Sequence, residues 1–148
     1  MIGALIGYFV PVFIIPLSFL ILGIVFTLRP PKEVNYLFGY RTRMSMINDK
    51  TWAFAHKLCG KYFIIIASVS LVLSTIIYFV VCHIYGVSMR VCSNTCIILV
   101  AISAVAPIFV LIPIEIALRK KFDNFGREKE ALKELEESGE SKKEEKRE

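Results

Sequence analysis

Residues 62–89 read YFIIIASVSLVLSTIIYFVVCHIYGVSM, and this stretch decides the fold. It contains no Asp, Glu, Lys or Arg, and its single histidine is His83. An α-helix rises about 1.5 Å per residue, so roughly 20 apolar residues cross the hydrocarbon core of a bilayer, which is about 30 Å thick. Lipid offers no partner for backbone N–H and C=O groups, so a crossing segment must satisfy them internally. The sequence therefore predicts a transmembrane helix over about 62–85.

Two further uncharged stretches, 2–28 and 91–114, are also long enough to cross a bilayer. Apolar residues make up 55% of the 148 residues, and they are gathered in these blocks rather than interspersed with polar ones. The predicted fold is an all-α membrane protein with three transmembrane helices, at about 2–28, 62–85 and 91–115. These helices and the loop 29–61 form one predicted membrane domain, 1–121, followed by a charged tail, 122–148.

Lysine and arginine are distributed unevenly around the predicted spans. None precedes the first span, seven lie between the first and second, only Arg90 lies between the second and third, and ten follow the third. Cytoplasmic segments of membrane proteins are enriched in these residues. We therefore expect a multi-pass protein of the cytoplasmic membrane, with the N-terminus and the 84–92 turn outside and the 29–61 loop and the tail inside.

The net charge of +5 comes from the 29–61 loop, which contains seven cationic and two acidic residues. The tail from Arg119 contains ten of each and is neutral overall. Attraction to anionic membrane lipid is the simplest consequence of a basic loop beside a bilayer. No nucleic-acid-binding motif accompanies it, so direct binding to nucleic acid is not expected. The tail is predicted to be helical at first and disordered from Ser138, where the composition becomes almost entirely polar.

Cys82, Cys92 and Cys96 are expected near the outer face, with His83 beside them. Residues 92 and 96 are four apart, which places both thiols on one face of a helix. Three interpretations remain open: packing as small apolar residues, a disulfide from Cys82 to Cys92 or Cys96, and a metal site using Cys92, Cys96 and His83. Packing is the simplest, and no cofactor is expected.

The 29–61 loop contains the segment NYLFGYRTRMSMINDKTWAFAHKLCG, residues 35–60. Gly39 permits a tight turn, and Thr42 and Ser45 are side chains that cap turns. Asn48 followed by Asp49 is typical of a helix start. That start predicts a cytoplasmic interfacial helix running from Asp49 towards Gly60 and into the second span, with Trp52 at the level of the lipid headgroups.

The spacing of Gly39, Arg41, Thr42, Ser45, Asn48 and Trp52, followed at once by a span, resembles the SdpI family of bacterial membrane proteins. The resemblance covers about 1–121, and its distinctive part is 35–61. It implies that these six residues form the binding or structural motif. It also implies immunity to a secreted peptide toxin outside the cell and relay of the toxin's presence to a cytoplasmic regulator at the loop. Longer members have additional N-terminal spans, and this chain resembles their C-terminal module.

Glu115 is the one carboxylate within or bordering a predicted span, and an acid in that position is a candidate functional residue. Three interpretations are open: contact with the guanidinium of Arg41, solvation at the cytoplasmic end of the span, and a functional intramembrane acid.

Three classes of function can be compared with this pattern. An enzyme is not expected, because no metal-binding or nucleophile motif is present. A small oligomeric transporter or channel is the alternative to toxin immunity and signalling, since prolines in the first and third spans predict kinked helices. The oligomeric state itself is not predicted.

Overall fold

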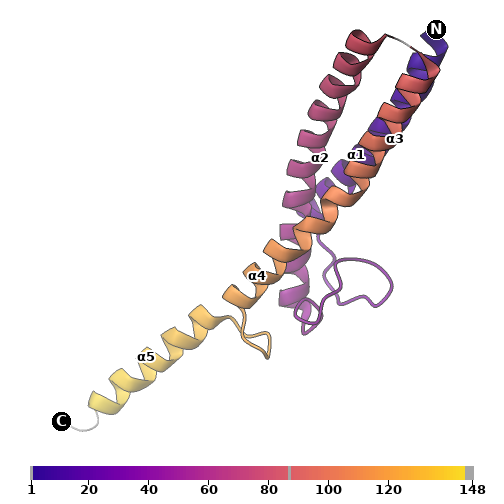
Figure 1. The fold of residues 1–148 in the computed structure, drawn as a ribbon. Coiled ribbons are helices and arrows are strands. Elements are labelled where there is room, and N and C mark those ends of the chain that lie inside the picture. Colours follow the sequence, from indigo (N-terminus) through magenta and orange to yellow (C-terminus); the bar gives the residue numbers. More distant parts are fainter. Residues whose placement is uncertain (1, 87, 146–148) are drawn as a thin grey trace. The chain divides into compact units, whose positions relative to one another are not determined.

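The computed structural model describes residues 2–86 and 88–145 (Figure 1). Its elements are α1 (Ile2–Leu28), α2 (Asp49–Tyr85), α3 (Met89–Val105), the 3₁₀ helix η1 (Ala106–Val110), α4 (Leu111–Lys121) and α5 (Lys129–Glu145). Three helical runs are long and apolar enough to cross a membrane, and they lie at Gly7–Leu28, Asp49–Tyr85 and Met89–Lys121. The predicted all-α fold with three transmembrane helices is confirmed.

The chain divides into two compact units. Unit 1 comprises residues 1–30 and 57–111, and unit 2 comprises residues 31–56 and 112–148. Unit 1 holds most of the apolar helix surface, and unit 2 holds the loop motif and the tail.

In unit 1, α1 packs along α3 and also contacts α2. A core cluster joins the three helices at one end; its members are Val12, Tyr78, Cys82, Cys92, Cys96 and Leu99. At the other end, Gly23 of α1 and Gly60 of α2 bring the two backbones together. A Cβ added to Gly60 would lie 2.7 Å from the carbonyl oxygen of Gly23, so only glycine fits at this crossing.

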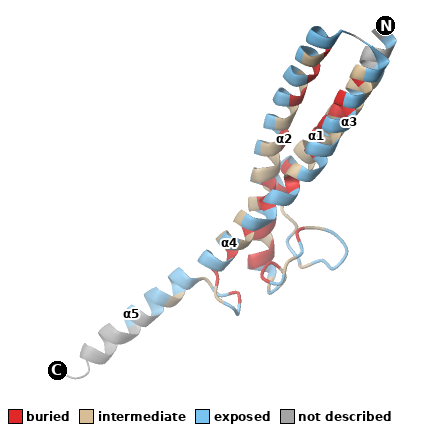
Figure 2. Cartoon of the chain, in the orientation of Figure 1, coloured by how far each residue is buried: buried red, intermediate tan, exposed pale blue. Residues whose placement is uncertain are grey.

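Elsewhere in unit 1, large apolar side chains of α1, α2 and α3 are exposed, and much of each helix is pale blue in Figure 2. In a soluble protein such a surface would drive aggregation. Along helices long enough to cross a bilayer it is the surface that lipid covers.

One detail differs from the sequence prediction, and another is in line with the kink predicted from the prolines of the third span. Helix α2 starts at Asp49, as predicted, but it continues unbroken to Tyr85, so the structure does not set residues 49–61 apart as an interfacial helix. The third helical run is interrupted by η1, which has Pro107 near its start. Proline lacks the N–H that would bond to the carbonyl four residues earlier, and a 3₁₀ segment accommodates that loss.

In unit 2, a loop connects residue 31 to the start of α2, and a tight turn at 122–128 connects α4 to α5. Helix α5 continues to Glu145, whereas the sequence predicts disorder from Ser138. Glutamate and lysine have high helix propensity, which sustains a helical backbone without a core. The last part of the predicted tail, residues 146–148, lies outside the described residues.

Candidate functional site

The motif residues gather where the loop meets the first turns of α2. Gly39 has a positive φ of 120°, and a Cβ at this position would collide with Nε2 of His56. The next residue, Tyr40, donates its backbone N–H to the same Nε2, at 2.9 Å. The loop backbone therefore lies directly on the imidazole ring, and glycine is the residue that allows this approach.

His56 is fixed from both sides. Its Nδ1 lies 2.9 Å from the carbonyl oxygen of Trp52, and its ring packs against the Trp52 indole with centroids 4.2 Å apart. Because Nε2 accepts from Tyr40, the proton of the neutral ring lies on Nδ1 and is donated to Trp52. Both side chains are completely buried. His56 therefore acts as a connector between the loop and α2.

Thr42 and Ser45 close the next turn reciprocally. The N–H of Thr42 donates to Oγ of Ser45 at 2.9 Å, and the N–H of Ser45 donates to Oγ1 of Thr42 at 3.2 Å. The Ser45 hydroxyl in turn donates to the carbonyl oxygens of Tyr40 and Thr42. These two short hydroxyl side chains satisfy backbone groups that would otherwise be unpaired in a tight turn.

Asn48 caps the N-terminus of α2. Its Oδ1 accepts the N–H of Thr51 at 2.9 Å, and Oγ1 of Thr51 accepts the N–H of Asn48 at 3.1 Å, which is a reciprocal capping arrangement. The amide Nδ2 of Asn48 donates to the carbonyl oxygen of Gly126 at 3.0 Å. One side chain therefore both starts the helix and joins it to the 122–128 turn.

Replacing Asn48 separates these two roles. Asn48→Ala removes the cap and the bond to Gly126, and it should lower the free energy of unfolding by about 1–2 kcal/mol. Asn48→Ser keeps a capping oxygen but is too short to reach Gly126, so it should cost less. Thermal unfolding of both variants in detergent checks that Asn48→Ala loses more stability than Asn48→Ser. Equal losses would show that the cap itself contributes little.

The 122–128 turn is organised by Asp123. Its carboxylate accepts the backbone N–H groups of Phe125 and Arg127 and pairs with the Arg127 guanidinium at 2.8 Å. Partial desolvation opposes ionisation, but these hydrogen bonds outweigh it and lower the pKa of Asp123. The turn is therefore stabilised at neutral pH, and that contribution is lost as the pH falls through the lowered pKa.

Arg41 is the motif residue whose side chain remains exposed. Its guanidinium makes no hydrogen bond or ion pair with the residues that the structure describes. Arg43, two residues further on, is also exposed. The other motif residues hold the loop in shape, and Arg41 is the one presented on its surface.

Glu115 pairs with Arg119, one turn further along α4, through Oε1 and Nε at 3.0 Å. No contact joins Glu115 to Arg41 within the described part of the chain, so the interpretation of an Arg41–Glu115 pair is not what the structure shows. The second oxygen, Oε2, is buried and has no hydrogen-bond partner among the described residues.

Trp52 is 0% exposed, so its indole packs inside the protein instead of facing lipid headgroups as an interfacial anchor would. The sequence prediction of Trp52 at the headgroup level follows the usual preference of tryptophan for the interface. Here two contacts place the indole in the core of unit 2. Its ring packs against His56, and Gly39 approaches so closely that an added Cβ would lie 3.2 Å from the Trp52 ring.

The cysteines near the other end of α2 are free thiols. Cys82 and Cys92 are buried with their sulfurs 3.7 Å apart, and Cys96 is buried in the same cluster. His83 is exposed. Within residues 2–86 and 88–145, no group of three or more His, Cys, Asp or Glu side chains is arranged to hold a metal ion.

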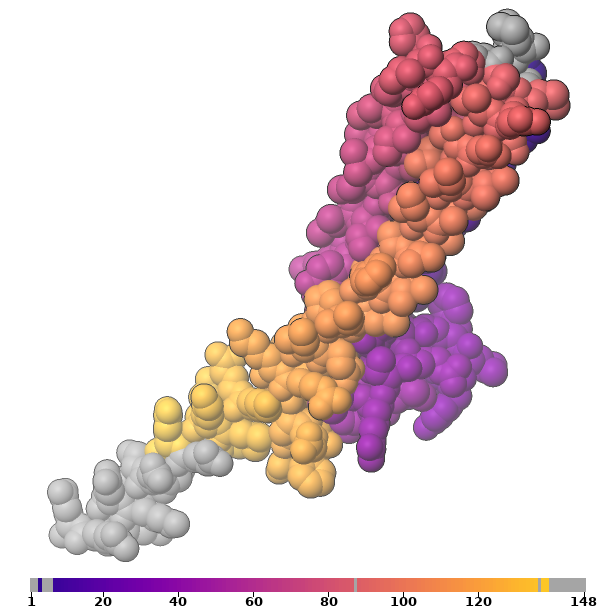
Figure 3. Space-filling view, viewed as in Figure 1, coloured from indigo at the N-terminus to yellow at the C-terminus, as the bar shows by residue number. Residues whose placement is uncertain are grey.

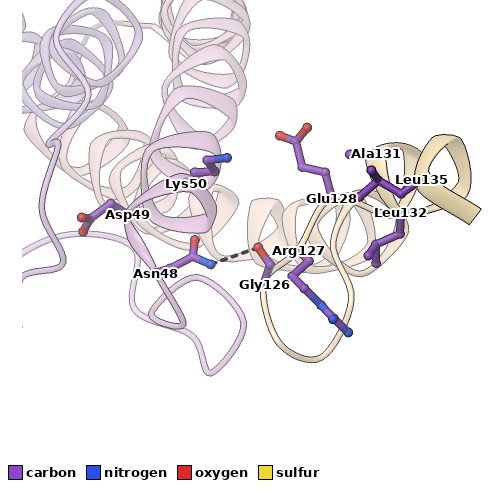
Figure 4. Close-up of a pocket in the computed structure, with 9 residues that line it drawn as sticks. All are labelled: Asn48, Asp49, Lys50, Gly126, Arg127, Glu128, Ala131, Leu132 and Leu135. Carbon is purple, nitrogen blue, oxygen red and sulfur yellow. Dashed lines mark hydrogen bonds between the residues drawn. The ribbon is translucent and has the colours of Figure 1, made fainter. Parts of the chain in front are cut away.

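A cleft of about 660 Å³ opens in unit 2 beside the Asn48–Gly126 bond. Figure 4 shows one wall formed by the start of α2 and the other by the 126–128 turn and the first turns of α5. The part of this second wall that belongs to α5 is apolar, with Ala131, Leu132 and Leu135. The lining of the cleft is therefore apolar along α5 and charged at Asp49, Lys50, Arg127 and Glu128.

Sequence reasoning missed three residues that hold this site together: His56, Asp123 and Gly126. The partners of His56 lie 4 and 16 residues away, and the longer contact is not visible in a local pattern. Asp123 and Gly126 do carry a signal, since aspartate and glycine three residues apart are typical of a tight turn.

Comparison with known proteins identifies the family of this chain. The model of the SdpI/YfhL protein family matches residues 32–114. The uncharacterized protein YfhL of Bacillus subtilis (strain 168) is 39% identical over 46 residues, an alignment that spans 31% of this chain and 42% of YfhL. No solved structure gives a significant match. Because the family match covers more than half of the chain and includes the motif loop with α2 and α3, this chain belongs to the SdpI/YfhL protein family.

Proposed function

We propose that this membrane protein protects its cell from a secreted peptide toxin and relays the toxin's presence to a cytoplasmic regulator through the motif loop. Membership of the SdpI/YfhL family supports the proposal, since the matched residues include the whole of the motif. In this proposal the protein is not an enzyme, and its partners are the toxin on the outer side, the regulator on the inner side and membrane lipid.

The charge distribution supports the assignment of each partner to one side of the membrane. Residues 29–61 hold seven lysines and arginines, whereas residues 84–92, around the turn between α2 and α3, hold only Arg90. Cytoplasmic loops are richer in these residues, which favours the motif loop inside and the turn outside. A toxin would then meet the turn and the outer ends of the helices, and a regulator would meet the loop.

The observation that carries the proposal is the contrast between Arg41 and its neighbours. Ser45, Trp52 and His56 are completely buried in a network of hydrogen bonds, whereas Arg41 is exposed. An arginine fork is suited to a carboxylate on a partner protein. A hydrogen-bonded network that leaves the motif arginine exposed is better explained by recognition than by the stability of the loop.

The test is survival of a strain that lacks the protein when it is challenged with peptide toxins from its own and related cells. Wild type should restore survival. Arg41→Ala should not, although its level in the membrane should be unchanged because the guanidinium makes no hydrogen bond or ion pair with the described residues. Arg43→Ala, which removes a neighbouring exposed cation, is the matched control and should protect like wild type.

Equal sensitivity of the deletion strain and its parent would reject immunity to those toxins. Protection by Arg41→Ala at the wild-type level would reject the role of the loop. In the first case the small transporter or channel becomes the better hypothesis, and Glu115→Gln is the variant to measure because the buried Oε2 has no hydrogen-bond partner among the described residues.

A further inference from the structure

The tip of the loop carries apolar side chains on the surface of unit 2. Leu37 is 91% exposed and Tyr36 is 72% exposed, and Phe38 beside them is also largely exposed. The loop segment is purple in Figure 3, where its atoms lie at the surface. Three consecutive large apolar side chains exposed to water are unfavourable in a free loop. The question is therefore what covers them.

This tip is held in a defined shape. The N–H of Val34 donates to Oδ1 of Asp49 at 3.2 Å on one side, and Tyr40 is bound to His56 on the other. Between these anchors, the N–H of Leu37 donates to Oδ1 of Asn35 at 2.7 Å and closes a turn. The apolar side chains are therefore presented by an ordered turn.

The chain itself limits what can cover the tip. Helix α1, which is apolar and long enough to cross a membrane, ends at Leu28, and Leu37 follows nine residues later. Even a fully extended chain spans at most about 3.6 Å per residue, so the tip stays within roughly 30 Å of the end of that helix. A bilayer is always within reach of the tip, whereas a soluble partner would have to be recruited.

The cations beside the tip are also suited to the surface of a bilayer. Lys32 precedes it and Arg41 follows it, and both are exposed. Cations next to the bilayer are attracted to anionic headgroups. Apolar side chains between cations form the pattern of segments that lie in the membrane interface.

We propose that Tyr36, Leu37 and Phe38 insert into the interface of the bilayer crossed by α1, with Lys32 at the headgroups. The loop tip, and not Trp52, is then the interfacial anchor of unit 2. This inference is independent of the proposed function, since it requires neither a toxin nor a regulator.

The experiment uses the full chain in vesicles of phosphatidylethanolamine and phosphatidylglycerol. A small environment-sensitive fluorescent amino acid is introduced at position 37, where the exposed side chain leaves the fold undisturbed. Emission is measured with lipid-attached nitroxide quenchers and with aqueous iodide. The same probe at Ile98, which is exposed on α3, provides the lipid reference, and at Glu130, which is exposed at the start of α5, the aqueous reference.

The expected result is severalfold stronger quenching at position 37 by the nitroxide lipid than at position 130, together with protection from iodide. Quenching by iodide to the extent seen at position 130 would overturn the proposal, because the tip would then lie in water. Protection from both quenchers would also overturn it, in favour of a protein cover such as a second copy of the chain.

Discussion

Gly60→Val is expected to destabilise the protein more than any other single substitution considered, by about 3 kcal/mol, the upper end of the usual cost of overpacking. A Cβ at Gly60 would lie 2.7 Å from the carbonyl oxygen of Gly23 and 2.8 Å from the backbone nitrogen of Thr27. These are backbone atoms of α1, which cannot move away without separating the two helices. Unfolding by SDS titration in mixed micelles measures the loss.

Gly7→Ala provides the matched control for this crossing. Gly7 also lies in a membrane-spanning helix, but a Cβ at this position would meet no atom within 4 Å. Because alanine has the higher helix propensity, this variant should be neutral or slightly stabilising. If Gly60→Val unfolds at the same SDS fraction as Gly7→Ala, then α1 and α2 do not approach as closely as described.

Gly39→Ala is expected to have the second-largest effect, about 2 kcal/mol, within the usual cost of a strained backbone, and to act on the motif loop. Its φ of 120° is unfavourable for an L side chain, at a cost of about 1–3 kcal/mol. The new methyl group would also collide with His56 and displace the acceptor of the Tyr40 N–H. Hydrogen exchange of the Tyr40 amide, read by mass spectrometry of the loop peptide, should accelerate strongly.

Gly86→Ala separates the cost of backbone strain from the cost of the collision with His56. Gly86 also has a positive φ, 80°, but a Cβ there would meet nothing within 4 Å. It therefore carries backbone strain without a collision, and it should cost less than Gly39→Ala. Equal costs at the two positions would mean that the contact with His56 contributes nothing to the stability of the loop.

The spans were predictable because a bilayer imposes a simple rule on sequence. A helix that crosses lipid needs a long uncharged stretch, and each of the three such stretches lies largely within one of the three helical runs. The start of α2 was predictable for a local reason, since Asn48 caps the helix by accepting the N–H of Thr51, three residues later, and Asp49 places an acid in the first turn.

The features that could not be predicted depend on contacts between residues distant in sequence. Nothing local indicates that Asn48 binds the carbonyl of Gly126, 78 residues later. The burial of Trp52 likewise depends on Gly39 approaching from the loop, and a composition rule that places tryptophan at membrane interfaces gives the opposite result. The six motif residues were identifiable as a group, but their division into packed residues and one exposed arginine required coordinates.

The proposed function requires the motif loop to face the cytoplasm and the turn between α2 and α3 to face outward. Single cysteines at Lys50 and Ser88, both exposed, test this directly in intact cells with a membrane-impermeant maleimide. The wild-type protein is the control, because its four cysteines are buried. We predict that Ser88→Cys is labelled in intact cells and that Lys50→Cys is labelled only after lysis. Labelling of Lys50→Cys in intact cells would contradict the proposed orientation.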